Sequence, residues 1–233
     1  MNIGGVLKAR GKVAAKRIRI HPPDNIGFAD FWEFVSPFAT DDLEIKKWRW
    51  KQLIHVLPQY FKIRFMRVFA KITGVMVADS CLSIVVRRGD GRIQNFGIAS
   101  FRLVTDNGVG FIVDAFQNLV EAENMKFHGL GTGIVAEAQT DSALGTELTT
   151  EYTGDVRATG SLTEGATPNI FKTVGTNTLD SGTPAITEHG VFTQAATGGG
   201  VLLDRSKFAA INLVGANGDS LQSTYSLTLT AGG

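Results

Sequence analysis

A series of short β-like runs fills the chain from residue 83 to residue 230, and it constrains the fold more than any other feature. Runs at 83–88 and 92–103 flank Gly89-Asp90-Gly91, and Asp-Gly is a favoured pair in the tight turn of a hairpin. Further runs fall near residues 126–130, 157–163, 169–179, 185–194, 201–213 and 221–230. Strands this short, separated by turn residues, predict an antiparallel β-sandwich or a jelly-roll-like fold.

The last of these runs shows the clearest alternation. One set of residues would share a face of the strand: Leu221, Ser223, Tyr225, Leu227 and Leu229. Successive side chains of a strand point to opposite faces, so we expect this face to be buried.

One helix is expected within the β-rich part. Thr105 or Asp106 can cap its N-terminus. Apolar residues then recur at helical spacing, at Val109, Ile112, Val113, Phe116 and Leu119. We expect this stripe to pack onto a sheet.

The first 80 residues have a different composition. Residues 1–21 contain no acid and six cations: Lys8, Arg10, Lys12, Lys16, Arg17 and Arg19. We interpret this segment as a basic arm, which stops at Pro22-Pro23.

Two helices are expected after the arm. Asp30 can start a short one that ends at Pro37, and Thr40 or Asp41 a longer one that ends at Leu57, before Pro58. Residues 61–72 also repeat at helical spacing. The longer helix would have one apolar side formed by Leu43, Trp50, Leu53, Ile54 and Leu57.

These patterns predict an α+β fold. Residues 1–80 would form a basic, mostly helical region, and residues 81–233 a mostly antiparallel β-sandwich or jelly-roll-like module with one packed helix.

Charge is divided unevenly along the chain. Residues 1–100 hold 17 Lys and Arg against 8 Asp and Glu, whereas residues 101–233 hold 6 against 14. Such opposite charges favour contact between the halves, between neighbouring copies, or between the basic half and an acidic partner such as nucleic acid.

Cations and aromatic residues interleave between residues 46 and 51. This combination can bind phosphate and stack on bases, or lie at a membrane surface. We favour the simpler interpretation that the helix buries Trp50 and leaves its lysines in water. If this region does contact nucleic acid or a protein partner, the candidate residues are the six cations of the arm together with Lys46, Lys47, Arg49 and Lys51.

The segment Gly131-x-Gly133-x-x-Ala136 superficially resembles a dinucleotide-binding loop. That loop requires a second apolar strand, and here the chain continues through the polar residues 149–154. We therefore interpret it as a glycine-rich turn.

Other chemistry is not indicated. The four histidines (His21, His55, His128 and His189) form no metal-binding motif such as H-E-x-x-H, and Cys81 lies in an apolar run without a nucleophile motif. The longest apolar run, residues 65–86, is interrupted by charged residues, which disfavours a membrane span. We expect no enzyme activity, cofactor, metal or membrane partner.

Three stretches together resemble modules of tailed-bacteriophage virions. Residues 104–116 resemble a helix that opens such modules, residues 127–144 their "GTG…A…DTAL" segment, and residues 186–221 their "ITE-x-G-[IL]-F … GG-x-L-L-x-R … GDSL" ending. The resemblance covers about residues 84–233, with order and spacing preserved. It implies a virion structural protein of the head-decoration, tail or fibre type, assembled in the cytoplasm of the host bacterium.

This resemblance implies contacts with other virion proteins and a homo-oligomer, and it assigns no catalytic residue. Two alternatives stay open. The basic N-terminal half would bind nucleic acid in one, and the loops near Gly198 and Gly215 would contact a host receptor or a glycan in the other.

Overall fold

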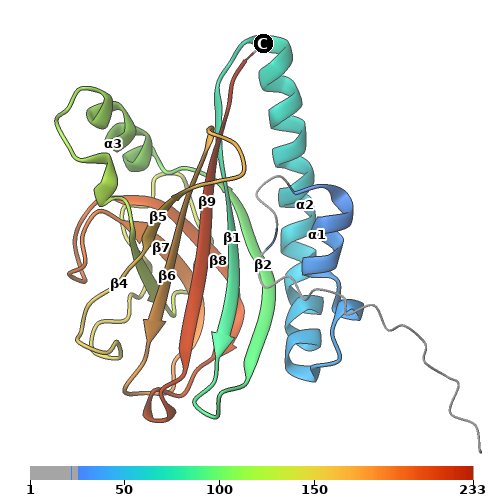
Figure 1. The fold of residues 1–233 in the computed structure, drawn as a ribbon, viewed down its shortest axis with the longest axis vertical. Coiled ribbons are helices and arrows are strands. Elements are labelled where there is room, and N and C mark those ends of the chain that lie inside the picture. The colour runs from blue at the N-terminus through green and yellow to red at the C-terminus, as the bar shows by residue number, and fades with distance from the viewer. Residues whose placement is uncertain (1–21, 23–25, 233) are drawn as a thin grey trace, which may run out of the picture.

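The computed structural model describes residue 22 and residues 26–232. Their fold combines helices with two antiparallel sheets, as expected (Figure 1). The helices are α1 (Phe28–Val35), α2 (Leu43–Thr73) and α3 (Asp106–Phe116), with single 3-10 turns at Pro37–Ala39, Ala122–Asn124 and Gly215–Asn217.

The two sheets enclose the main hydrophobic core. The first sheet has the order β2 (Ile93–Leu103), β1 (Val77–Arg87), β9 (Ser220–Thr230), β6 (Ile170–Thr178) and β5 (Ser161–Glu164). The second has the order β4 (Ala158–Thr159), β3 (Phe127–Gly131), β7 (Ala185–Phe192) and β8 (Leu202–Asn212). The strands follow the runs expected from the sequence, and Leu221 and Tyr225 of β9 are fully buried.

The predicted hairpin between β1 and β2 is present. The amide of Arg88 donates to the carbonyl of Arg92 at 2.9 Å, and that of Gly91 donates to the carbonyl of Arg88 at 2.8 Å. Gly91 has φ of +86°, which only glycine adopts without strain.

Helix α2 closes one open side of the sandwich, between the edge strands β2 and β8. The indole N–H of Trp48 donates to the carbonyl of Ala209 at 2.7 Å. Gln52 bridges both edges, since its side chain donates to the carbonyl of Ala99 and accepts from the amide of Ala209. Exposed strand edges favour aggregation, so this cover protects both sheets.

The helices and the sandwich share apolar clusters. Ile45 and Trp48 of α2 belong to the core between the sheets. Phe31 of α1 stacks on Tyr60 of α2, with ring centroids 4.2 Å apart, and both pack against Phe101 of β2. The predicted boundary between residues 80 and 81 falls inside β1.

The prediction that the long helix ends at Leu57 was wrong. Helix α2 begins after Asp42, whose carboxylate accepts from the amides of Glu44 and Ile45, and continues through Pro58 to Thr73. A proline removes one helical hydrogen bond, but Pro58 lies on the exposed side of α2, where water can satisfy the carbonyl left without a donor.

The predicted inward faces of two helices were only partly right: Leu53, Leu57 and Ile112 pack against the core, but other members of the two faces do not. In α2, Leu43, Trp50 and Ile54 point to solvent. In α3, Phe111 is buried against the sheets, while Phe116 is exposed. Both helices are apolar on opposite sides, so their spacing alone did not identify the side that packs.

Candidate interaction surface

Seven large apolar side chains line the outward side of α2. They are between 50% and 77% exposed, and we call them the outer stripe: Leu43, Trp50, Ile54, Phe61, Phe65, Val68 and Ile72. The buried residues of α2, such as Gln52 and Ile63, lie on the opposite side. Contiguous apolar surface of this kind marks sites of interaction in soluble proteins.

Aromatic rings from neighbouring segments extend the outer stripe. Phe38 meets Trp50 edge to face, with ring centroids 5.5 Å apart, and Phe28 of α1 lies 6.5 Å from Phe61. Phe28 is itself stacked with the half-exposed Trp32 at 6.4 Å. Helices α1 and α2 therefore present one continuous aromatic surface to solvent.

The spacing of the stripe matches helix pairing. From Leu43 to Phe61 the outward positions advance by alternating steps of four and three, and Lys47 and the half-buried Leu57 complete the series. Such a repeat keeps one seam of a helix facing a second helix along its length.

The residues predicted to contact a partner differ in their exposure. The six cations of the arm lie outside the described residues. Lys47 and Lys51 are exposed beside the outer stripe and Lys46 is half-buried. Arg49 is buried, so its assignment to a surface contact was wrong.

Arg49 instead joins α2 to the rest of the molecule. Its guanidinium donates to the carbonyls of Phe96 and Asn95 at 3.2 Å, of Ser36 at 3.0 Å and of Glu33 at 3.3 Å. Burial without a carboxylate partner lowers the pKa of Arg49 to about 10. In the sequence Arg49 stands among the cations of residues 46–51, and nothing in that cluster indicated that this one would be buried.

Cations flank the outer stripe along its whole length: Lys46, Lys47, Lys51, Lys62, Arg64 and Lys71. Among the residues that the structure describes, none of these six forms an ion pair. The stripe therefore combines apolar surface with uncompensated positive charge.

The glycine-rich segment after β3 surrounds an internal carboxylate. The amide of Gly133 donates to Glu188 Oε1 at 2.9 Å, and the amides of Gly145 and Thr146 donate to the same carboxylate at 3.0 and 2.8 Å. Glu188 also pairs with Arg205 at 2.7 Å. A Cβ at Gly133 would lie 2.4 Å from Glu188 Oε1, so the glycine permits this close approach.

Two histidines from separate strands meet inside the sandwich. His128 Nδ1 lies 2.9 Å from His189 Nε2, and His128 Nε2 lies 3.0 Å from Thr173 Oγ1. Burial lowers the pKa of His128 to about 3 and that of His189 well below its ordinary value, so both rings are neutral near pH 7. No motif in the sequence predicts this pair, because 61 residues separate its two members.

A polar cleft of about 380 Å³ lies between α2 and the segment near residue 137. Its lining includes Lys62, Arg102, Glu137 and Arg205. Arg102 pairs with Glu137, and Arg205 with Asp141 and Glu188, so most of this charge is compensated within the chain. In residues 26–232, no group of three or more His, Cys, Asp or Glu side chains is placed to hold a metal ion.

The loops considered for receptor binding contact their own chain. The amide of Gly198 donates to Glu147 at 3.0 Å, and Arg157 donates to the carbonyl of Gly199 at 2.8 Å. At Gly215, an added Cβ would lie 1.9 Å from the carbonyl oxygen of Ser181. Both loops are thus held against the sandwich.

Comparison with known proteins found no family model and no curated protein that matches the chain. No helix of the described residues is long and apolar enough to cross a membrane. The outer stripe is therefore the candidate site for a protein partner among the surfaces described above.

Proposed function

We propose that this protein is a non-enzymatic structural subunit of a phage virion, in the head decoration, tail or fibre, and that it acts by protein–protein contacts through the outer stripe of α2. The outer stripe carries the proposal, because it leaves seven large apolar side chains in water on a helix whose other side is well packed. A protein partner that covers these side chains removes apolar surface from water.

The β-sandwich supports the same proposal. Its interior is held by buried ion pairs and hydrogen bonds, such as Glu188 with Arg205 and Arg157 with Glu147. Loops held by such contacts give a rigid body that presents α2 in one orientation, and many rigid copies on one particle add avidity. The sequence resemblance of residues 84–233 to virion modules supplies the kind of particle.

The test uses phage particles released by the host strain that carries the gene. An antibody against residues 84–233 should label these particles in electron micrographs. The Ile54→Glu/Phe65→Glu variant should remove the label, because two new charges disrupt the outer stripe. The matched control, Val156→Glu/Leu162→Glu, changes two exposed apolar residues on strands and turns away from α2 and should keep it. Unlabelled wild-type particles would contradict the proposal.

A second candidate, nucleic-acid binding, is favoured by the exposed Trp50 and by its neighbours Lys46, Lys47 and Lys51, none of which pairs with an acid among the described residues. Counterion release makes such binding fall steeply as salt rises. A fluorescence titration with double-stranded DNA at several salt concentrations tests it. Lys47→Glu/Lys51→Glu should reduce both the affinity and the salt dependence if the cations contact phosphates.

A further inference from the structure

Helix α3 has an apolar outer side of its own. Val109, Val113 and Phe116 recur at steps of four and three, and Leu119 follows just beyond the helix. All four are exposed, with Phe116 the most exposed at 77%. We call these four residues the α3 patch. Its spacing matches that of the outer stripe, so both surfaces have the geometry of helices that pair along a seam.

An apolar groove adjoins the α3 patch. It has a volume of about 210 Å³ and lies between α3 and the sheets, with Phe111, Ile112, Phe116, Met125, Phe171 and Leu227 in its lining. Such a groove accepts an apolar side chain from outside the molecule. The outer stripe carries two phenylalanines and a tryptophan that project into solvent.

The charges around the two surfaces are opposite. Residues 104–125 contain four acids, Asp106, Asp114, Glu121 and Glu123, and no Lys or Arg. Helix α2 has six Lys and Arg beside the outer stripe and one acid, Glu44; its two other cations are the buried Arg49 and Arg67, which pairs with Asp79. Charge complementarity of this kind directs two surfaces to each other and fixes their orientation.

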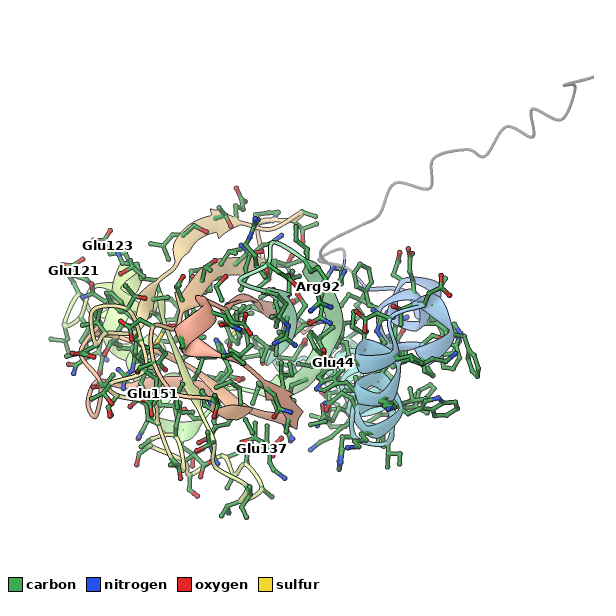
Figure 2. The ribbon with its side chains drawn as sticks, turned by 90° about the horizontal axis from the view of Figure 1, so that it is seen from below. Glu44, Arg92, Glu121, Glu123, Glu137 and Glu151 are labelled. Atoms are coloured by element: carbon green, nitrogen blue, oxygen red, sulfur yellow. The ribbon has the colours of Figure 1, made fainter. Side chains whose placement is uncertain are left out.

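The two surfaces lie on opposite sides of the molecule. Figure 1 shows α3 and α2 flanking the sandwich, and in Figure 2 Glu121 and Glu123 lie on the side away from α1 and α2. They therefore cannot meet within one chain. Every copy of the chain nevertheless carries one outer stripe and one α3 patch.

We infer that the α3 patch of one copy docks on the outer stripe of α2 of the next copy. This inference rests on the proposed function and names the partner of the outer stripe. Helix α3 has 11 residues and is about 16 Å long, which equals the span from Ile54 to Phe65 in α2. Contacts between different surfaces of identical subunits form rings or open chains, the arrangements found in repetitive particles.

Charge disfavours two other occupants. Two copies of α2 placed face to face would oppose their unpaired cations. The arm of residues 1–21 carries six cations and no acid, so it has the same sign as α2. Anionic lipid has the right charge, but it does not explain the matching spacing and groove at α3.

The test exploits the two-surface geometry. Sedimentation velocity is measured for the full chain and for two variants, Ile54→Glu/Phe65→Glu in the outer stripe and Val113→Glu/Phe116→Glu in the α3 patch. The wild type should assemble beyond a dimer as concentration rises. Each variant alone should be monomeric, and their equimolar mixture should form a 1:1 dimer, because one intact pair of surfaces remains. Val156→Glu/Leu162→Glu serves as the control and should assemble as the wild type does. Thermal unfolding confirms that every variant is folded.

Several outcomes would overturn the inference. A wild type that stays monomeric at every concentration excludes docking between copies. If the variant of the α3 patch still assembles and the variant of the outer stripe does not, α2 pairs with itself. This result would contradict the inference and leave the proposed function intact. A mixture that stays monomeric excludes complementary docking. Sedimentation of the monomer with phosphatidylserine vesicles, lost in the α2 variant, would assign the stripe to a membrane surface.

Discussion

Trp48 and Trp50 lie two residues apart in α2 and face opposite ways. Trp48 is 4% exposed and donates its indole N–H to the carbonyl of Ala209, whereas Trp50 is 50% exposed and meets Phe38 edge to face. The first tryptophan holds the helix to the sandwich. The second belongs to the surface that we assign to a partner.

These two residues should therefore differ in their contribution to stability. Trp48→Ala is expected to lower the free energy of unfolding by about 3–5 kcal/mol, because it leaves a cavity in the core and an unpaired carbonyl. Trp50→Ala should change it by less than about 1 kcal/mol, as expected of an exposed position. Urea unfolding of the two variants measures both. Equal losses would contradict the orientation of α2.

Arg49 should be essential to the docking of α2. Arg49→Met removes the donors to four carbonyls and is expected to cost about 3 kcal/mol of unfolding free energy. Lys51→Met, the matched control at an exposed cation, should cost less than about 0.5 kcal/mol. If both variants unfold at the same urea concentration, Arg49 does not play this part.

Gly133 should tolerate no side chain. Gly133→Ala places a methyl group against the Glu188 carboxylate and should destabilise the fold by about 2 kcal/mol. Gly110→Ala in α3 has open space around it and should stabilise by about 0.5–1 kcal/mol, since alanine favours a helix. Calorimetric melting temperatures should move in opposite directions. A neutral Gly133→Ala would show that the loop does not clasp Glu188.

The buried histidine pair should make the fold sensitive to acid. The unfolded chain takes up protons on these histidines below their ordinary pKa of 6.5, whereas the folded chain keeps them neutral to about pH 3 at His128. Stability contributed by the pair is therefore complete above pH 6.5 and is lost as the pH falls below it. The measurement uses the Asp204→Asn variant, because the buried carboxyl of Asp204 titrates in the same pH range. If the urea midpoint of this variant stays constant from pH 7 to pH 4.5, the prediction is contradicted.

Asp204 opposes that trend. Burial raises its pKa to about 6, despite hydrogen bonds from Ser80 and Ser206, so the folded chain binds a proton between pH 6 and 3.8 that the unfolded chain does not. The ionised form is thus unfavourable above pH 6. Asp204→Asn should stabilise the protein at pH 8 by on the order of 2 kcal/mol and steepen the loss of stability below pH 6. A variant that is less stable than wild type at pH 8 would contradict the assignment.

Local signals in the sequence located the strands well. The alternation in residues 221–230 and the Asp-Gly turn at residue 90 depend on neighbouring residues alone. The C-terminal end of α2 was harder to predict. A proline usually ends a helix, but α2 continues through Pro58, which lies on its exposed side.

Long-range relationships were not accessible from the sequence. Glu188 is clasped by loop amides more than 40 residues away, and His128 meets His189 across the sheet. The inward side of α2 could not be chosen because both sides are apolar, and the buried side also contains Arg49 and Gln52. Of the five apolar residues that the sequence placed on one side, the fold exposes Leu43, Trp50 and Ile54, and it packs Leu53 and Leu57 against the core.

Hydroxyl-radical footprinting of the unmodified protein tests most directly whether a partner copy covers the outer stripe. Oxidation of Trp50, Phe61, Phe65 and Phe116 is compared between dilute and concentrated samples, with the buried Trp48 as an internal reference. We predict that all four become protected together as the protein assembles. Oxidation that stays unchanged at these residues across the whole concentration range would contradict the assignment of the stripe as a contact between copies.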